Sequence, residues 1–256
     1  APLETGRWSS GFYAGPKNQI ALAEISENLN MTVDYGFLWW IAEPLFSVLN
    51  YFHEVTGNWG AAIILLTIFV KAALFWFSHK GYHSMANLRR VAPAMKRLQE
   101  RYSNDREKLS KEMMALYQKE GANPLGGCLP MLLQMPLLFA LFQVFRTTIE
   151  LRNEPFVWWI KDLSSPDVIV NLPFTIPLYG SHIAFLPILM ALSTYAQQKM
   201  MSGGIQQPQQ KMMQNFMMVF FFLIFNNFPS GLNLYYTLFN VLTIAQQKLL
   251  PNKPKA

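Results

Sequence analysis

One lysine lies inside an otherwise apolar stretch of this chain. Lys71 falls within residues 59–77, which read WGAAIILLTIFVKAALFWF. A cation near the centre of a bilayer costs about 2.5–3.5 kcal/mol on insertion scales, and charges in such positions usually have a function. The alternative is that Lys71 only extends toward the nearby end of its segment, where its ammonium group reaches water. No acidic residue lies in this segment or in the four other apolar segments that we predict below to span a membrane, so we expect Lys71 to face a hydrated pocket.

Polar side chains in other apolar segments recur at helical spacing. At about 100° per residue, Thr67 shares a helix face with Lys71. In residues 232–247 one face carries the polar side chains of Asn233, Tyr236, Asn240, Thr243 and Gln247. Two helices with single polar faces favour one shared cavity, although polar groups that merely bond between helices, at about 0.6 kcal/mol each, give the same pattern. The predicted lining of the cavity consists of Lys71, Thr67, Gln134, Tyr236, Asn233, Asn240, Ser193 and Gln197.

Other residues that could do chemistry form no complete site. His79 and His83 have a spacing that can hold a metal ion, but no third ligand is near them in the sequence. A protease using Lys71 would need a nucleophile at the same depth, and Ser193 is the one candidate. No glycine-rich phosphate-binding loop is present. We therefore predict no catalytic centre, no metal site and no cofactor, and expect that the protein is not an enzyme.

The composition places these residues in a membrane protein. Hydrophobic residues make up 52% of the 256 and charged residues only 14%, against about 25% charged in soluble domains. The five longest apolar segments, which we predict to be membrane-spanning helices, are residues 59–77, 128–145, 183–196, 212–225 and 232–247. An apolar, proline-rich stretch from Val168 leads into the third of them. The predicted fold is an all-α integral membrane protein with a five-helix transmembrane bundle.

Charge in the connecting segments orients this bundle. The segments outside the spans fall on two sides of the membrane: residues 78–127, 197–211 and 248–256 carry fifteen Lys and Arg, and residues 1–58 and 146–175 carry five. This asymmetry predicts a periplasmic N-terminal end and a cytoplasmic C-terminal end. Residues 84–120 have helical apolar spacing on either side of a short polar turn and predict a cytoplasmic helical hairpin. Residues 37–57 are apolar and aromatic but contain Glu43 and Glu54, which is typical of an interfacial amphipathic helix.

Several short motifs resemble those of YidC-type membrane insertases, the YidC/Oxa/Alb family. They are Asn123-Pro124-Leu125-Gly126-Gly127-Cys128-Leu129-Pro130 with Gln134-Met135-Pro136, Phe228-Pro229-Ser230-Gly231-Leu232 with Tyr235-Tyr236, Val33-Asp34-Tyr35-Gly36, Gly57-Asn58-Trp59-Gly60, and Glu112-Met113-Met114-Ala115-Leu116-Tyr117. Together the motifs extend over nearly the whole chain, and their joint occurrence is highly specific.

The resemblance implies five core spans around a hydrophilic groove that opens to the cytoplasm and to lipid. Family members normally have an arginine in this groove, and the matching position is Lys71. Lysine keeps the charge but lacks the planar fork of arginine. Thr67 and Tyr236 fall on positions that the family uses beside the cation. The implied activity is that of an insertase and chaperone in the bacterial inner membrane, and the alternative function is a small-solute transporter or channel using the same cavity.

The resemblance also implies partners and a domain plan. The expected partners are nascent membrane proteins, the Sec translocon, the ribosome and membrane lipids, with no specific recognition of nucleic acid. Residues 1–36 resemble the end of a periplasmic region, residues 37–57 form the interfacial helix, and residues 58–256 form the insertase core. We expect an N-terminal anchor helix and most of a periplasmic domain to precede residue 1 in the full protein.

Overall fold

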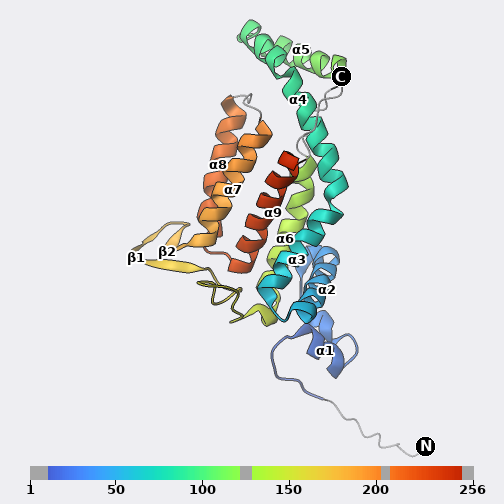
Figure 1. Cartoon of the computed structure of the whole chain (residues 1–256), viewed down its shortest axis with the longest axis vertical. Helices are drawn as coiled ribbons and strands as arrows, with labels where there is room; N and C mark the ends of the chain where they lie inside the picture. Colours follow the sequence, from blue (N-terminus) through green and yellow to red (C-terminus); the bar gives the residue numbers. More distant parts are fainter. Residues whose placement is uncertain (1–10, 122–128, 203–207, 250–256) are drawn as a thin grey trace, which may run out of the picture.

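The computed structural model describes residues 11–121, 129–202 and 208–249 (Figure 1). The helices are α1 (Gln19–Ile25), α2 (Trp39–Thr56), α3 (Trp59–Ala73), α4 (Phe75–Arg101), α5 (Arg106–Lys119), α6 (Leu129–Thr147), α7 (Phe185–Ser202), α8 (Pro208–Phe225) and α9 (Ser230–Leu249). The strands are β1 (Val168–Ile176) and β2 (Gly180–Ala184). Three short 3-10 helices, η1 (Leu29–Thr32), η2 (Gly36–Leu38) and η4 (Ile149–Leu151), lie in the connections.

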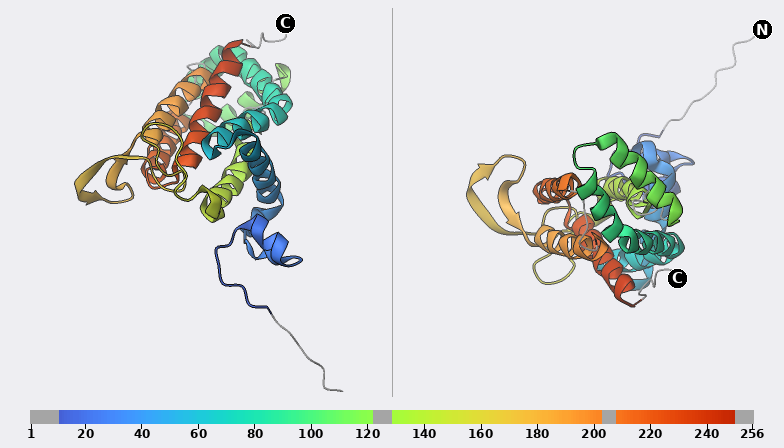
Figure 2. Two further views of the ribbon diagram at one scale, coloured as in Figure 1. Left: turned by 60° about the horizontal axis from the view of Figure 1, so that its bottom comes forward. Right: turned by 90° about the horizontal axis from the view of Figure 1, so that it is seen from above.

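Helices α3, α6, α7, α8 and α9 run side by side and form the body of the molecule (Figures 1 and 2). Helix α9 packs against both α7 and α3. Helix α2 packs against α3 and α6, and helix α8 packs against α7. The apolar core among these helices includes the fully buried side chains of Leu49, Leu66, Leu141, Leu232 and Tyr235. Because α9 contacts both sides of the bundle, its faces decide which polar groups meet inside.

Each of the five apolar segments forms a helix, but the first one is broken. Helix α3 ends at Ala73 and α4 begins at Phe75, and the axes of the two helices differ by 59°. Across the described ranges, no helix by itself has the length and apolar content needed to cross a bilayer, whereas Trp59–Ala73 and Phe75–Tyr82 together have them as a bent pair. The expected single helix over residues 59–77 is therefore wrong at its C-terminal end.

Residues 84–120 form the far half of α4, a turn and α5, which extend beyond the bundle (Figure 1). The side chain of Asp105 accepts a hydrogen bond from the backbone N–H of Lys108 and caps α5. A salt bridge of 3.2 Å between Arg90 and Glu120 joins the two arms. Helix α4 is continuous through Pro93 and begins at Phe75, so the first arm of the hairpin is an extension of the bundle.

The segment before α7 corrects the all-α expectation. Strands β1 and β2 pair antiparallel, with Val168 opposite Ala184 and Ile176 opposite Gly180. Val168-Ile169-Val170 favours extended backbone because β-branched residues pack well on a pleated surface. Pro173 and Pro177 oppose a helix, and Gly180, with a φ of 99°, permits the turn.

Four polar side chains fasten the loops at the lower ends of α7, α8 and α9 in Figure 1; we call Asp162, Asp167, Asn226 and Ser230 the loop clasp. The Ser230 hydroxyl donates to the carbonyl of Asp162 at 2.8 Å. Asn226 donates to the carbonyls of Tyr179 and His182, both at 2.8 Å, and accepts from the N–H of Ala184. The turn between α8 and α9 is thereby joined to the loop before β1 and to the β-hairpin.

The two carboxylates of the loop clasp have opposite electrostatic environments. Asp167 accepts hydrogen bonds from the N–H groups of Phe185 and Leu186 at the start of α7, yet burial raises its pKa. Burial also acts to raise the pKa of Asp162, but hydrogen bonds from Ser164, Ser165 and Asn153 outweigh it and hold that pKa below its ordinary value. Asp162 therefore stabilises the fold above about pH 4 and loses this effect as the pH falls through its lowered pKa.

The motif Gly57-Asn58-Trp59-Gly60 makes the connection from α2 to α3. Gly57 ends α2 with a φ of 65°, and the Asn58 side chain accepts from the N–H of Ala61 and caps α3. The Trp59 ring stacks on His53 with the ring centroids 3.9 Å apart. A Cβ atom at Gly60 would overlap the ring of Phe156, so this glycine permits the loop after α6 to pack on α3.

We predict that Gly60→Ala destabilises the protein. Alanine gains about 0.5–1 kcal/mol of helix propensity over glycine, but overpacking against Phe156 costs about 1–3 kcal/mol, so the net effect is a loss. Thermal unfolding of the purified protein measures it. Gly11→Ala is the matched control, because nothing lies within 4 Å of its added Cβ atom. A Gly60→Ala protein at least as stable as the parent would show that Phe156 moves aside without cost.

Candidate functional site

Lys71 is buried in the last turn of α3 and is bound by a hydroxyl of α9. Its side chain is 7% exposed, and Nζ donates to Thr243 Oγ1 at 2.7 Å. The Thr243 hydroxyl in turn donates to the backbone carbonyl of Phe239 at 2.8 Å. Because its only hydrogen is used in that bond, the Thr243 oxygen is fixed as an acceptor toward the lysine.

Aromatic rings complete the surroundings of the ammonium group. Lys71 Nζ lies 4.5 Å from the centroid of the Phe239 ring and 6.0 Å from that of Tyr82. A cation over a desolvated ring face gains about 2 kcal/mol. Within the part of the chain that the structure describes, no salt bridge includes Lys71. The charge is thus stabilised by a hydroxyl and by ring faces, and it has no fixed carboxylate partner there.

The polar face of α9 continues toward α7. Asn240, one turn before Thr243, donates to Ser193 Oγ at 3.1 Å and to Thr194 Oγ1 at 2.9 Å. Ser193 donates its own hydrogen to the Met190 carbonyl at 2.8 Å. Lys71, Thr243, Asn240 and Ser193 therefore connect α3, α9 and α7, and together with Tyr82 of α4 we call them the polar cluster.

Two residues of the predicted lining have other hydrogen-bond partners. The Thr67 hydroxyl donates to the Ile63 carbonyl of its own helix at 2.7 Å. Asn233 donates to the carbonyl of Phe225 at 3.1 Å, near the end of α8, and lies close to the loop clasp. Thr67 lies one turn from Lys71, whereas Asn233 lies nearly two turns from Asn240. Because Asn233 bonds Phe225, it joins the end of α8 to the start of α9.

A second group of polar atoms lies between α6 and α9. The Gln134 amide is close to the hydroxyls of Tyr235 and Tyr236. Even so, Gln134 Nε2 and the Tyr235 hydroxyl have no well-formed hydrogen bond. About three turns farther along α9, neither amide atom of the buried Gln246 side chain has one. Gln197, half-buried, lies one turn beyond Ser193 on α7. Buried polar atoms without partners each cost about 1–3 kcal/mol, so this region favours a polar occupant.

Sequence reasoning missed part of the polar cluster. Thr243 was on the predicted polar stripe but not in the predicted lining, although its i+3 spacing from Asn240 was a usable signal. Tyr82, whose hydroxyl faces Thr243 and Gln247, gave no signal, because the break at Leu74 changes the direction of the chain before α4. Phe239 looked like ordinary core.

The other chemistry considered from sequence is not assembled. Lys71 bonds Thr243 while Ser193 bonds Asn240 and Met190, and no hydrogen bond between Lys71 and Ser193 is seen in the described residues. In the same residues, no three His, Cys, Asp or Glu side chains gather as metal ligands. The structure does not describe the side chain of His83, nor residues 123–128 of the Asn123–Pro130 motif.

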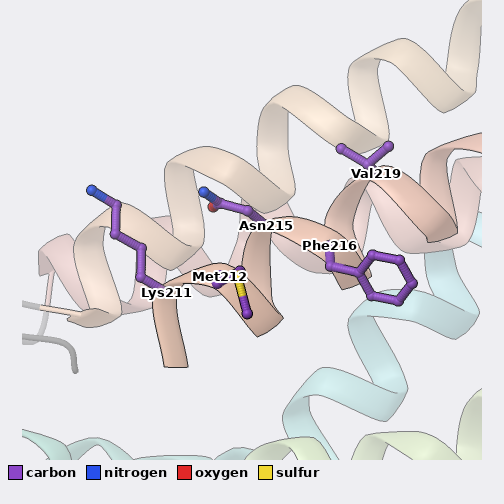
Figure 3. A pocket seen from close by; sticks show the side chains of 5 residues that line it. All are labelled: Lys211, Met212, Asn215, Phe216 and Val219. Atoms are coloured by element: carbon purple, nitrogen blue, oxygen red, sulfur yellow. The ribbon is translucent and has the colours of Figure 1, made fainter. Parts of the chain in front are cut away.

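A shallow pocket of about 600 Å³ lies apart from the polar cluster, along α8 (Figure 3). All five residues that line it come from this helix: Lys211, Met212, Asn215, Phe216 and Val219. Met212 and Phe216 are largely exposed. Lys211 and Asn215 are the polar residues of this lining, and Met212, Phe216 and Val219 are the apolar ones. The pocket is therefore an open, largely apolar strip that lacks the convergent polar groups of a small-molecule site.

We predict that Lys71 and Thr243 are energetically coupled. Thr243→Val keeps the side-chain shape but removes the acceptor, which leaves the ammonium group without its hydrogen bond and costs about 1–3 kcal/mol. A double-mutant cycle with Lys71→Met, read by unfolding free energies, should give a coupling of at least about 0.5 kcal/mol. Thr237→Val is the control on α9, since its hydroxyl bonds only the Asn233 carbonyl of its own helix. Additive effects for the Lys71–Thr243 pair would contradict the assignment.

Comparison with known proteins places the chain. The family model described as 60Kd inner membrane protein matches residues 51–256, and the one described as YidC periplasmic domain matches residues 1–48. A protein of Saccharophagus degradans named "Membrane protein insertase YidC" is 46% identical over 98% of this chain and 42% of its own length. A relative of the same name from Shewanella woodyi is 46% identical over 98% of this chain and 44% of its own length.

A solved structure has the same fold. It is described as "Active YidC insertase crystal structure with the first transmembrane domain resolved", and it matches with a TM-score of 0.63 and 22% identity over 92% of this chain and 54% of that chain. The present chain spans less than half the length of the two curated relatives. With a family model covering residues 51–256 and relatives at 46% identity, this chain belongs to the YidC family of 60Kd inner membrane proteins.

Proposed function

We propose that this chain is the membrane-embedded part of a membrane protein insertase and chaperone. The observation that carries the proposal is the buried ammonium group of Lys71 in the polar cluster between α3 and α9, which has no carboxylate partner among the described residues. The names of the relatives, each a membrane protein insertase, support the activity. The client would be a nascent membrane protein, and the chain's own residues would bind and hydrate it without forming or breaking bonds.

The surface of the bundle supports five membrane spans, with α3 and the first turns of α4 sharing one of them. Helices α6, α7, α8 and α9 have 18 to 20 residues, which at 1.5 Å per residue gives about 27–30 Å, close to the hydrocarbon thickness of a bilayer. Large apolar side chains face outward from α3 and from these four helices: Phe69, Phe139, Leu192, Phe216, Val219 and Val241. Apolar groups outside and polar groups inside are what lipid surroundings favour.

The polar cluster would act by lowering a desolvation cost. Moving a polar segment into hydrocarbon costs several kcal/mol per unpaired group. The amide nitrogen of Gln134, both amide atoms of Gln246, the Tyr235 hydroxyl and the Lys71 ammonium group offer hydrogen bonds and a positive charge inside the bundle. A client's polar segment would exchange water for these groups, and its apolar helix would then move sideways into lipid. We propose that the client's polar segment lies in a hydrophilic groove, lined by these groups, that opens toward the cytoplasm and toward lipid.

The charged hairpin of α4 and α5 would lie in the cytoplasm and receive clients. It carries exposed Lys96, Lys108 and Lys111, which suit lipid headgroups or the ribosome. We place the N-terminal end of the chain in the periplasm and its C-terminal end in the cytoplasm of a bacterial inner membrane. The chain would work alone or together with the Sec translocon. Helix α2, with exposed Trp39 and Trp40, would lie in the interface.

We predict that the charge of Lys71 matters more than its shape. In proteoliposomes, Lys71→Arg should keep the insertion rate, because the positive charge remains. Lys71→Ala should slow clients with acidic outward segments by about tenfold, the effect of losing about 1.4 kcal/mol of attraction, and Lys71→Glu should slow them further by repulsion. Clients matched in every respect but with neutral segments should lose less. The rate of tail translocation, read by protease protection, measures this.

Lys248→Glu is the control for net charge, since Lys248 is exposed on the same helix as Thr243. It should leave both client classes unchanged. Equal losses for acidic and neutral clients in the Lys71 variants would show that Lys71 serves structure or hydration only. No loss in either class would mean that Lys71 has no part in insertion.

The proposed topology predicts labelling from opposite sides. After replacement of the single cysteine, Cys128, single cysteines at Lys108 and Lys161 should react with an impermeant reagent from the cytoplasmic and periplasmic sides respectively. Both positions are exposed, whereas Asp167 in the same loop as Lys161 is buried in the loop clasp and is unsuitable. Labelling of both cysteines from one side would refute the five-span arrangement.

A further inference from the structure

The β-hairpin of β1 and β2 exposes apolar side chains on both of its faces. The register shifts between Val168 and Val170, but seven of the nine residues of β1 are exposed, so both faces of the strand are open. Val168, Ile169 and Val170 are all 40–49% exposed. Phe174 is 59% exposed near the middle of the hairpin, and Leu178, at its tip, is 65% exposed. An isolated two-stranded hairpin is marginally stable at best in water. An uncovered one with two apolar faces therefore needs an apolar surrounding.

The hairpin is also free of charge. No Asp, Glu, Lys or Arg occurs between Asp167 and Lys199, a stretch that contains the whole hairpin and most of α7. Surfaces that face water, and the rims of most protein–protein contacts, carry charged residues. The chain also passes from Ala184 at the end of β2 directly into α7 at Phe185, so the hairpin is continuous with a helix that we propose to lie in lipid.

Two exposed apolar residues in or next to the hairpin, Trp158 and Leu178, have strained backbone conformations. Trp158 has a φ of 51° and Leu178 a φ of 67°, values in the left-handed region that bulky residues adopt only at an energetic cost. Trp158 is 88% exposed. Its ring stacks on that of Trp159, which donates a hydrogen bond to Asp167 directly before β1. A tryptophan bonded through its neighbour to the loop clasp thus lies at the base of the hairpin, and a leucine lies at its tip.

The direction of the hairpin fits the surface of a bilayer. Figures 1 and 2 show β1 and β2 projecting sideways from the lower ends of α7 and α8, across the direction of the bundle helices. If the bundle helices cross the membrane, the hairpin lies along its plane. Its unpaired strand edges exclude the hydrocarbon centre, where backbone groups need partners. Tryptophan is enriched at membrane interfaces, and the exposed Trp158 lies beside the hairpin.

We propose that the β1–β2 hairpin and Trp158 form an interfacial anchor, inserted at the boundary between headgroups and acyl chains of the periplasmic leaflet. The occupant of this surface is lipid. Through Asn226 and Asp167 the loop clasp joins the anchor to the turn between α8 and α9 and to the start of α7, so the anchor fixes the depth of these helices in the bilayer. The proposal rests on the membrane placement of the bundle given above.

The test uses spin labels on the chain in lipid nanodiscs. Single cysteines replace Phe174 and Leu178 after Cys128→Ser, with Phe139→Cys on the outer face of α6 as the lipid-facing control and Lys108→Cys as the water-facing control. Collision rates with oxygen, which concentrates in lipid, and with a water-soluble nickel complex are measured at each site. We expect the oxygen-to-nickel ratio at Phe174 and Leu178 to exceed that at Lys108 several-fold and to approach that at Phe139.

The other outcomes overturn the proposal in distinguishable ways. High nickel collision at Phe174 and Leu178, with Phe139 still in lipid, would place the hairpin in water. Low collision with both reagents would mean that protein covers it. Water-like values at Phe139 as well would show that the bundle is not placed in lipid as proposed, and the anchor would fail together with the proposed function.

Discussion

The burial of the Lys71 ammonium group, which has no carboxylate partner in residues 11–121, 129–202 and 208–249, constrains the interior of this bundle. An isolated charge in a low-dielectric interior is strongly unfavourable unless polar groups surround it. Lys71 meets this requirement with the Thr243 hydroxyl, whose single hydrogen is committed to its own helix, and with the ring of Phe239. Helix α9 must therefore keep its polar face toward α3. The same face then places Asn240 against Ser193 and Thr194, which sets the position of α7.

At the other end of the helices, backbone groups are fixed by side chains of the loops. Asp167 satisfies two N–H groups at the start of α7, and Ser230 ties the start of α9 to the loop after α6. Gly231 donates to the Leu163 carbonyl, and an added Cβ atom would lie only 3.2 Å from that oxygen. The motif Phe228-Pro229-Ser230-Gly231-Leu232 thus has a physical role. It lets α9 begin close to the loop, while the polar cluster lies farther along the helix.

The parts of this arrangement that follow a period could be predicted from the sequence, and the parts set by tertiary contact could not. Apolar length predicted five helices near their observed positions, although α7 extends six residues past the predicted end at 196. Helical spacing predicted the polar face of α9 that carries Asn240 and Thr243. The break at Leu74 has no proline or glycine to mark it. Tyr82 reaches the cluster only because of that break. The β-hairpin was mistaken for a lead-in to α7, since a short apolar run does not distinguish strand from helix. Its prolines and β-branched residues were the neglected signal.

The central claim is that the polar cluster receives the polar segment of a client. Photo-crosslinking in proteoliposomes tests it most directly. A single-span client, arrested during insertion, carries a photoreactive residue in its acidic outward-bound segment. Mass spectrometry of the products then identifies the contacted peptides. The account predicts crosslinks to α3, α7 and α9 near Lys71, Ser193 and Asn240, with a lower yield in Lys71→Glu. Crosslinks confined to the α4–α5 hairpin or to the outer face of α8, with no change in Lys71→Glu, would contradict it.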